Sequence, residues 1–124
     1  MNDEQKKAQA EFLQMVKEIF EDGEAEINGN KYKFLTMTHK ERRKVFAFYT
    51  KVSSQVTSRD MSFLSSHEFD EIEKIINLRV SYNDSLLDRL GDSHWEKYPQ
   101  DYVTFVTIAL TVISYPYFPA NPTA

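Results

Sequence analysis

The chain has 124 residues and a formal net charge of −4, and this length fits one compact domain. Hydrophobic residues make up 41% of the sequence and aromatic residues 14%, which supports a sizeable core. Only three glycines and four prolines argue against a turn-rich β-sandwich, and the absence of cysteine excludes a disulfide framework and thiolate metal sites. We therefore expect residues 1–124 to form a single domain.

The positions of the charged residues argue against export and against a membrane span. Charged side chains interrupt the first twenty residues, so no apolar signal segment is expected there. The longest uncharged stretch, residues 102–124, contains Thr104, Thr107, Thr111 and Pro116. Its apolar part is shorter than the roughly 20 residues that a bilayer requires. We expect a cytoplasmic protein that makes no membrane contact.

The first predicted element is an amphipathic helix in residues 1–22. Gly23 follows it, where a left-handed C-terminal cap is favoured. The apolar residues recur with the three- and four-residue spacing of one buried stripe. This stripe consists of Phe12, Met15, Val16, Ile19 and Phe20.

Residues 24–35 predict one short β-hairpin. Asn28 and Gly29 are the strongest turn signal in the chain, because both tolerate the positive φ angles of a type I′ turn. Tyr32 and Phe34 alternate with lysines after the turn. Since an isolated hairpin is only marginally stable, its apolar side must lie against helices.

Residues 38–114 predict a helical core. A capping box at residues 38–41 starts one helix, which we expect to end near Ser54 and to be followed by a polar loop. A second capping box at residues 65–68 starts the next helix, which we expect to end near Leu78.

Two further helices complete the predicted core. Asp84 is expected to cap a short helix that Gly91 closes. Pro99 suits the first turn of the last helix, where Asp101 is favourably placed against the helix dipole. Residues 102–113 are rich in β-branched residues, which favours a strand, but their polar side chains fall on one helical stripe and indicate a helix. These polar residues are Thr104, Thr107 and Thr111. The expected fold is mainly α, a small domain of four to five helices with one short N-terminal β-hairpin.

No pattern in the sequence identifies a catalytic or metal-binding site. The three histidines lie far apart, and no HExxH, EF-hand, phosphate-binding glycine loop or GxSxG pattern occurs. We interpret His94 as a partly exposed loop histidine, the alternative being a lone general base. The carboxylates within residues 70–73 either favour a helix start or bind a hard cation, and we prefer the first interpretation. We expect no enzyme, no cofactor and no metal.

The densest group of charges consists of Lys40, Arg42, Arg43 and Lys44. Clustered bases suit phosphate neutralisation, so a small nucleic-acid-binding regulator is one alternative. Cations at a helix N-terminus oppose the helix dipole, and so they also suit an acidic protein surface. Simple solvation is the third interpretation. The net negative charge of the chain argues against nucleic acid.

Residues 115–124 predict an extended tail. Pro116 prevents a helix from continuing, and three aromatic side chains follow the last helix: Tyr115, Tyr117 and Phe118. Such side chains need apolar contacts, which either their own domain or a neighbouring chain provides. The sequence therefore nominates these three aromatic residues and the four basic residues at 40–44 for partner binding.

Charge alternates along the chain in a way that suits self-association. Residues 1–26 carry a net charge of −5, residues 27–60 a net charge of +6, and residues 61–124 a net charge of −5. Surfaces of opposite sign pair either within one chain or between copies, and a head-to-tail contact that does not close gives an open oligomer.

Residues 25–118 resemble the phage tail assembly chaperones that are encoded just upstream of the tape measure protein. The resemblance lies in an order of features: a hairpin with Asn28 and Gly29, a basic helix that starts at Thr38, and a segment at 95–101 that runs into an apolar helix. The N-terminal helix lies outside it.

The resemblance implies a small, mainly helical, non-enzymatic protein. Its function would be to bind the tape measure protein and keep it soluble until tail tube subunits polymerise around it, and the tail tube protein is a second candidate partner. Such chaperones self-associate into open oligomers, act in the host cytoplasm and are absent from the mature virion. By this resemblance, the 124 residues would correspond to the short, unextended form.

Overall fold

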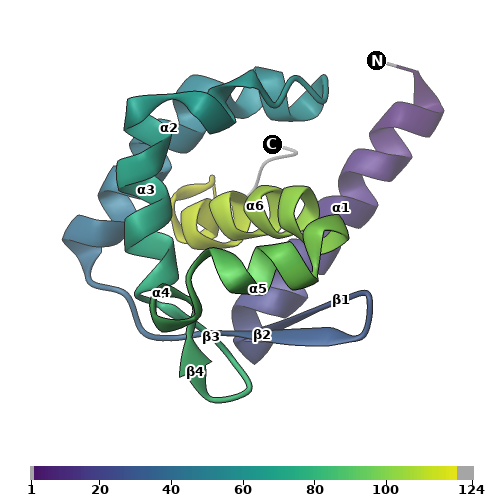
Figure 1. Ribbon diagram of the computed structural model, residues 1–124. Coiled ribbons are helices and arrows are strands. Elements are labelled where there is room, and N and C mark those ends of the chain that lie inside the picture. The colour runs from purple at the N-terminus through teal and green to yellow at the C-terminus, as the bar shows by residue number, and fades with distance from the viewer. Residues whose placement is uncertain (1, 120–124) are drawn as a thin grey trace.

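The computed structural model describes residues 2–119 (Figure 1). These residues form six α-helices, two short 3₁₀ helices and one four-stranded antiparallel sheet. The helices are α1 (Asp3–Asp22), α2 (His39–Thr57), α3 (His67–Asn77), α4 (Leu87–Leu90), α5 (Asp92–Lys97) and α6 (Pro99–Ser114), with η1 (Ser62–Ser65) and η2 (Tyr115–Tyr117) as the 3₁₀ helices. The strands are β1 (Glu24–Ile27), β2 (Asn30–Phe34), β3 (Val80–Tyr82) and β4 (Ser85–Leu86).

The prediction of a mainly α protein is confirmed, but its details need correction. The described residues contain six α-helices where four to five were expected, and a four-stranded sheet where one hairpin was expected. Residue 1 of the predicted first helix and residues 120–124 of the predicted tail lie outside the described part of the chain.

Helix α6 forms the centre of the molecule. Figure 1 shows it between α1 on one side and α2 and α3 on the other, with the sheet below. Ten of its sixteen residues are buried, which explains why its sequence is apolar on almost every face. The prediction of a helix from the threonine spacing is confirmed. Thr111 is buried, and its hydroxyl donates a hydrogen bond of 2.8 Å to the carbonyl of Thr107.

Helix α1 begins and ends as the sequence predicts. Asn2 caps its N-terminus, and Gly23 adopts φ of 76° in the left-handed region at its C-terminal end. Of the predicted stripe, Val16 and Ile19 are buried. Phe20 and Met15 lie at the edges of the stripe and are exposed, with 38% and 37% of their surface accessible to solvent.

The first predicted capping box is present, and the second is not. In α2 the amide of Glu41 donates to the Thr38 hydroxyl at 3.2 Å, while the Glu41 carboxylate accepts from the Thr38 amide at 3.0 Å. This helix continues to Thr57, three residues beyond the predicted end at Ser54. Helix α3 is capped by Ser66 alone, whose hydroxyl accepts from the amide of Phe69.

The sheet consists of two hairpins that pair side by side through β2 and β3, with strand order β1-β2-β3-β4. Helices α2, η1 and α3 separate the two hairpins along the chain. The predicted turn at Asn28 and Gly29 is confirmed, with φ of 51° and 85°. The second hairpin was missed. Its turn is formed by Asn83 and Asp84, with φ of 50° and 66°, and so Asp84 does not cap a helix as expected. Gly91 does close the short helix α4.

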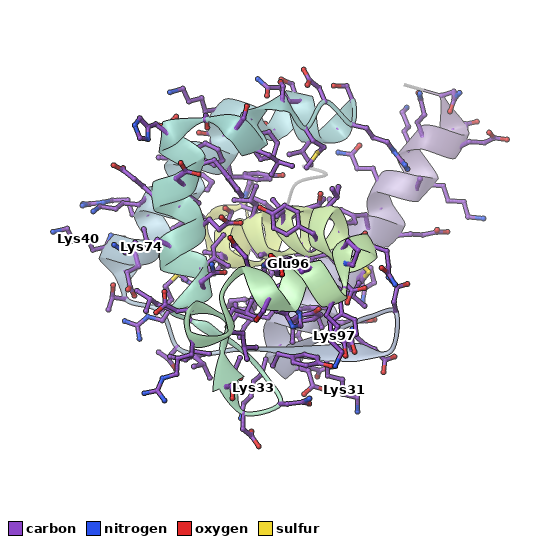
Figure 2. The ribbon with its side chains drawn as sticks, viewed as in Figure 1. Lys31, Lys33, Lys40, Lys74, Glu96 and Lys97 are labelled. Carbon is purple, nitrogen blue, oxygen red and sulfur yellow. The ribbon has the colours of Figure 1, made fainter. Side chains whose placement is uncertain are left out.

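The two faces of the sheet differ in character. Tyr32 is fully buried beneath the helices, whereas the neighbouring lysines of β2 point away from the helices into solvent (Figure 2). Across the outer face, Glu24 lies opposite Lys33, and Glu26 lies opposite Lys31. Opposite charges in directly facing positions stabilise a strand pair modestly.

Candidate functional site

The three aromatic residues after α6 pack on their own domain. The ring centroid of Tyr115 lies 5.3 Å from that of Phe20 in α1. Tyr117 and Phe118 turn to α2, where each has one main aromatic neighbour. Tyr117 lies 5.1 Å from Phe46, and Phe118 lies 5.7 Å from Tyr49. The interpretation that the tail folds back onto the domain is therefore correct for the described residues.

Helix α2 presents one continuous stripe to this aromatic segment. Residues His39, Arg42, Phe46 and Tyr49 follow a spacing of three, four and three, which places them on one side of the helix. At the start of the stripe, the hydroxyl of Tyr117 forms a hydrogen bond of 2.7 Å with Nδ1 of His39. The stripe and the aromatic segment are held together along three turns of α2.

Arg42 links all three helices that meet here. Its Nη1 donates to the carbonyl of Ile113 at 2.7 Å, near the C-terminal end of α6, where the helix dipole favours a cation. Its guanidinium carbon lies 5.8 Å from the centre of the Phe20 ring, within cation–π range. Burial lowers the pKa of Arg42, although the nearby Tyr117 opposes this effect. The side chain is half-buried.

The other three bases of the predicted cluster lie outside this stripe. Lys40, Arg43 and Lys44 are exposed and form no ion pair with a carboxylate of residues 2–119. Arg43 lies one helical turn from His39 and so borders the aromatic surface. Lys40 and Lys44 each lie two residues from Arg42, which places them on another side of α2, and Figure 2 shows Lys40 projecting from the edge of the molecule.

We refer to this surface as the tail face. It brings together four of the seven nominated residues, with the exposed Arg43 at its border. Its aromatic side chains keep part of their area exposed, so the surface offers both apolar area and positive charge to a partner. The tail face consists of Phe20, His39, Arg42, Phe46, Tyr49, Tyr115, Tyr117 and Phe118.

A small pocket of about 220 Å³ opens beside the tail face. Two arginines, Arg42 and Arg79, stand at its wall. The remaining wall is mainly apolar and comes from α1, the end of β2, the segment before α2 and the end of α6. The apolar lining includes Ile19, Phe20, Phe34, Met37, Val112 and Ile113.

A second pocket lies on another part of the surface. It is open, has a volume of about 350 Å³, and is lined by Trp95 and Tyr102 with three carboxylates. Tyr102 donates a short hydrogen bond to Glu73, and burial together with this bond raises the pKa of Tyr102 above its usual range. No group of three or more metal-ligating side chains is placed to hold an ion within residues 2–119.

His94 is buried, contrary to the interpretation as a partly exposed loop residue. It retains 5% exposure, and its Nε2 lies 2.8 Å from the hydroxyl of Tyr32. The same hydroxyl donates to Asp101 at 2.8 Å. Because an ionised carboxylate only accepts hydrogen bonds, the Tyr32 proton points to Asp101, and His94 must donate from Nε2 to Tyr32. The aromatic rings of Tyr82 and Trp95 enclose the imidazole.

Asp101 is the centre of this buried polar network. It has no exposed area, and its two oxygens also accept from Asn28 and Asn30, each at 2.8 Å. Burial acts to raise the pKa of Asp101, but the hydrogen bonds from Asn30, Asn28 and Tyr32 outweigh it and hold the pKa below the usual value. The network joins the first hairpin to the start of α6. The side chains of Asp101, His94 and Tyr32 are buried, and we interpret the network as one that stabilises the fold.

We expect stability to fall as pH decreases from 7.5 to 5.5. Burial lowers the pKa of His94 in the folded state, with Lys97 acting in the same direction and Asp101 opposing it. Below an unfolded-state pKa near 6.5, the unfolded chain therefore binds more protons than the folded chain. The free energy of unfolding should fall by about 1 kcal/mol over this pH range, which is measured as a shift in the urea midpoint. The pKa of Asp101 is lowered, so its contribution is lost only at more acidic pH.

The variant His94→Gln is the control for this pH effect, because glutamine keeps an N–H donor for Tyr32 but does not titrate. Its stability should change little between pH 7.5 and 5.5. An equally steep decline in this variant would show that another group causes it.

Sequence reasoning missed the buried network and four residues of the tail face, which are Phe20, His39, Phe46 and Tyr49. Asn28 was interpreted as a turn residue and Asp101 as a helix-dipole residue, and both interpretations are local. The one available signal was a single acid in an otherwise uncharged stretch after residue 97. Phe20 was assigned to the buried stripe of α1, although it borders Arg42 and Tyr115.

Comparison with protein-family models, with curated protein sequences and with solved structures gave no match. Among the described residues, no helix combines the length and apolar character needed to cross a membrane.

Proposed function

We propose that this chain is a protein-binding domain that acts as a phage tail assembly chaperone, with the tape measure protein as its partner. The observation that carries the proposal is the tail face, where half-exposed aromatic side chains surround Arg42 and the exposed Arg43 lies at their border. Interfaces are enriched in aromatic residues and arginine. The partner that such a surface fits is an amphipathic helix with apolar and acidic side chains.

The chemistry of the tail face favours protein over nucleic acid. Its rings pack against one another at centroid distances of 5.1 to 5.9 Å, as seen for Tyr117 with Phe46 and with His39, which leaves their flat faces partly covered. Single-stranded nucleic acids need open ring faces on which bases stack. The two acidic blocks of the sequence also repel a polyanion.

A charge-reversal variant tests this proposal. Arg43→Glu reverses the exposed charge at the border of the tail face and should weaken binding to the purified tape measure protein about fivefold, since an exposed interface charge contributes roughly 0.5 kcal/mol and its reversal replaces that attraction with a repulsion of similar size. The matched control is Lys31→Glu on the outer face of the sheet (Figure 2). Affinities would be measured by calorimetry at low salt.

The control variant should bind like the unmodified chain. Equal losses in both variants would mean that net charge alone matters. Absence of binding by the unmodified chain, or tighter binding to single-stranded DNA than to the tape measure protein, would refute the proposed function.

A further inference from the structure

The two arginines at the pocket beside the tail face differ in how their charge is satisfied. Arg79 donates from Nε and Nη2 to the two carboxylate oxygens of Glu41, at 3.0 and 3.1 Å. Within residues 2–119, the Arg42 side chain forms one hydrogen bond, to the carbonyl of Ile113, and no ion pair with a carboxylate. Of the five N–H donors that a guanidinium carries, Arg42 therefore uses one on an acceptor of the described residues.

The surroundings of Arg42 make an anion the suitable ligand. Its guanidinium is half-buried between the Phe20 ring and the end of α6. A cation that is partly removed from water loses hydration, and a paired anion restores the lost interaction. Arginine meets a carboxylate through two parallel hydrogen bonds, which gives such a pair both strength and orientation.

The volume of the pocket sets the size of the ligand. At about 220 Å³ it is smaller than the roughly 300–1,000 Å³ of pockets that hold drug-sized ligands and cofactors. A cavity of roughly 150 Å³ accommodates a benzene ring. The pocket therefore fits one aliphatic side chain, with a carboxylate at its mouth.

We propose that this pocket is an anchor site for a partner helix, which inserts one aliphatic side chain and pairs an aspartate or glutamate one turn away with Arg42. The aliphatic side chain lies against Ile19, Met37 and Val112, which are buried apolar residues of the pocket. Side chains three or four residues apart in a helix share one face, so a single amphipathic helix supplies both groups. The inference rests on the proposed function, because the tape measure protein is the partner assigned to this helix.

Peptides that tile the tape measure protein provide the test from the partner side. The tile that binds most tightly is resynthesised with each glutamate changed singly to glutamine and each aspartate to asparagine. One of these changes should weaken binding about 10- to 100-fold, as expected for losing a hydrogen-bonded charge pair. This arm leaves the folding of the chain itself unaffected.

The test from the side of this chain uses Arg42→Gln, with the exposed neighbour Arg43→Gln as the matched control. Arg42→Gln should weaken binding of the unmodified peptide about 10- to 100-fold, and Arg43→Gln at most about threefold. The peptide that lacks the essential carboxylate should bind Arg42→Gln and the unmodified chain equally, because the pair is already broken. Thermal melts of both variants establish that each is folded.

The outcomes separate the pocket from the proposed function. If tiles bind but are insensitive both to loss of each carboxylate and to Arg42→Gln, the anchor site is wrong and the proposed function stands. If no tile and no intact tape measure protein binds, the proposed function itself fails. A third measurement adds octanoate, a small carboxylate with an aliphatic chain, and follows the NMR signals of the Arg42 side chain. If octanoate shifts these signals more strongly than any peptide does but displaces no peptide, the pocket is a site for a small carboxylate and the helix anchor is wrong.

Discussion

Replacing Asp101 with alanine should lower the free energy of unfolding by about 2–5 kcal/mol. The carboxylate is fully buried and accepts hydrogen bonds from three side chains of the first hairpin. Without it, the hydroxyl of Tyr32 and the amide of Asn30 lose their acceptor. A buried donor left without a partner costs about 1–3 kcal/mol, and two such donors remain.

The position of Asp101 in the fold makes this loss larger than that of an average surface acid. The network that it holds spans 69 to 73 residues of sequence and is the polar link between the β1–β2 hairpin and the start of α6. Asp101→Asn should be intermediate between the unmodified chain and Asp101→Ala, because an amide oxygen still accepts from Tyr32 while its NH₂ group faces another donor.

The matched control is Asp92→Ala. Asp92 occupies the first turn of α5 and is exposed, so it shares the favourable interaction with a helix N-terminus but accepts no buried hydrogen bond. Asp92→Ala should lower the free energy of unfolding by at most about 0.5–1 kcal/mol. Urea titrations followed by circular dichroism measure both variants. Equal losses in the two variants would mean that the buried network adds no stability beyond the dipole interaction.

The elements that sequence reasoning predicted are those whose signals are local. The capping box of α2, the glycine after α1 and the Asn28-Gly29 turn each depend on residues within four positions of one another. The second hairpin also has such a signal, because Asn83 and Asp84 both tolerate positive φ. It was missed since its strands contain only three and two residues, too few for an alternating pattern.

The polar core could not be predicted in this way, because its contacts join distant parts of the chain. His94 and Tyr32 are separated by 62 residues, and Asp101 and Asn28 by 73. Nothing in the sequence near His94 distinguishes a buried imidazole from an exposed one. The site was more accessible to sequence reasoning, since a basic cluster and an aromatic segment are unusual in composition. Which of the bases faces the aromatic segment depends on how α2 is rotated about its own axis when it packs against α6.

The aromatic segment of the tail face also stabilises the domain, and a deletion tests this contribution. Deleting residues 115–124 should lower the free energy of unfolding by about 2–4 kcal/mol. The deletion removes Tyr115, Tyr117 and Phe118, which pack on α1 and α2. Full burial of one large apolar side chain contributes about 1.5–3 kcal/mol. Each of these three is half-buried, and so each contributes about half as much.

The point substitution Tyr117→Phe separates ring packing from hydrogen bonding. It keeps the ring against Phe46 and removes the hydroxyl that meets His39. Because that hydrogen bond is exposed to solvent, the substitution should cost at most about 0.5–1 kcal/mol. Thermal melts of the dilute protein, recorded by circular dichroism, measure both variants. If the deletion leaves the melt unchanged but abolishes larger species in sedimentation, the rings matter for contacts between chains, and their packing on α1 and α2 contributes nothing to the stability of the single domain. If it lowers the melt as expected, the same rings that a partner would meet also fasten α1 to α2, and partner binding at the tail face must stabilise the folded chain by mass action.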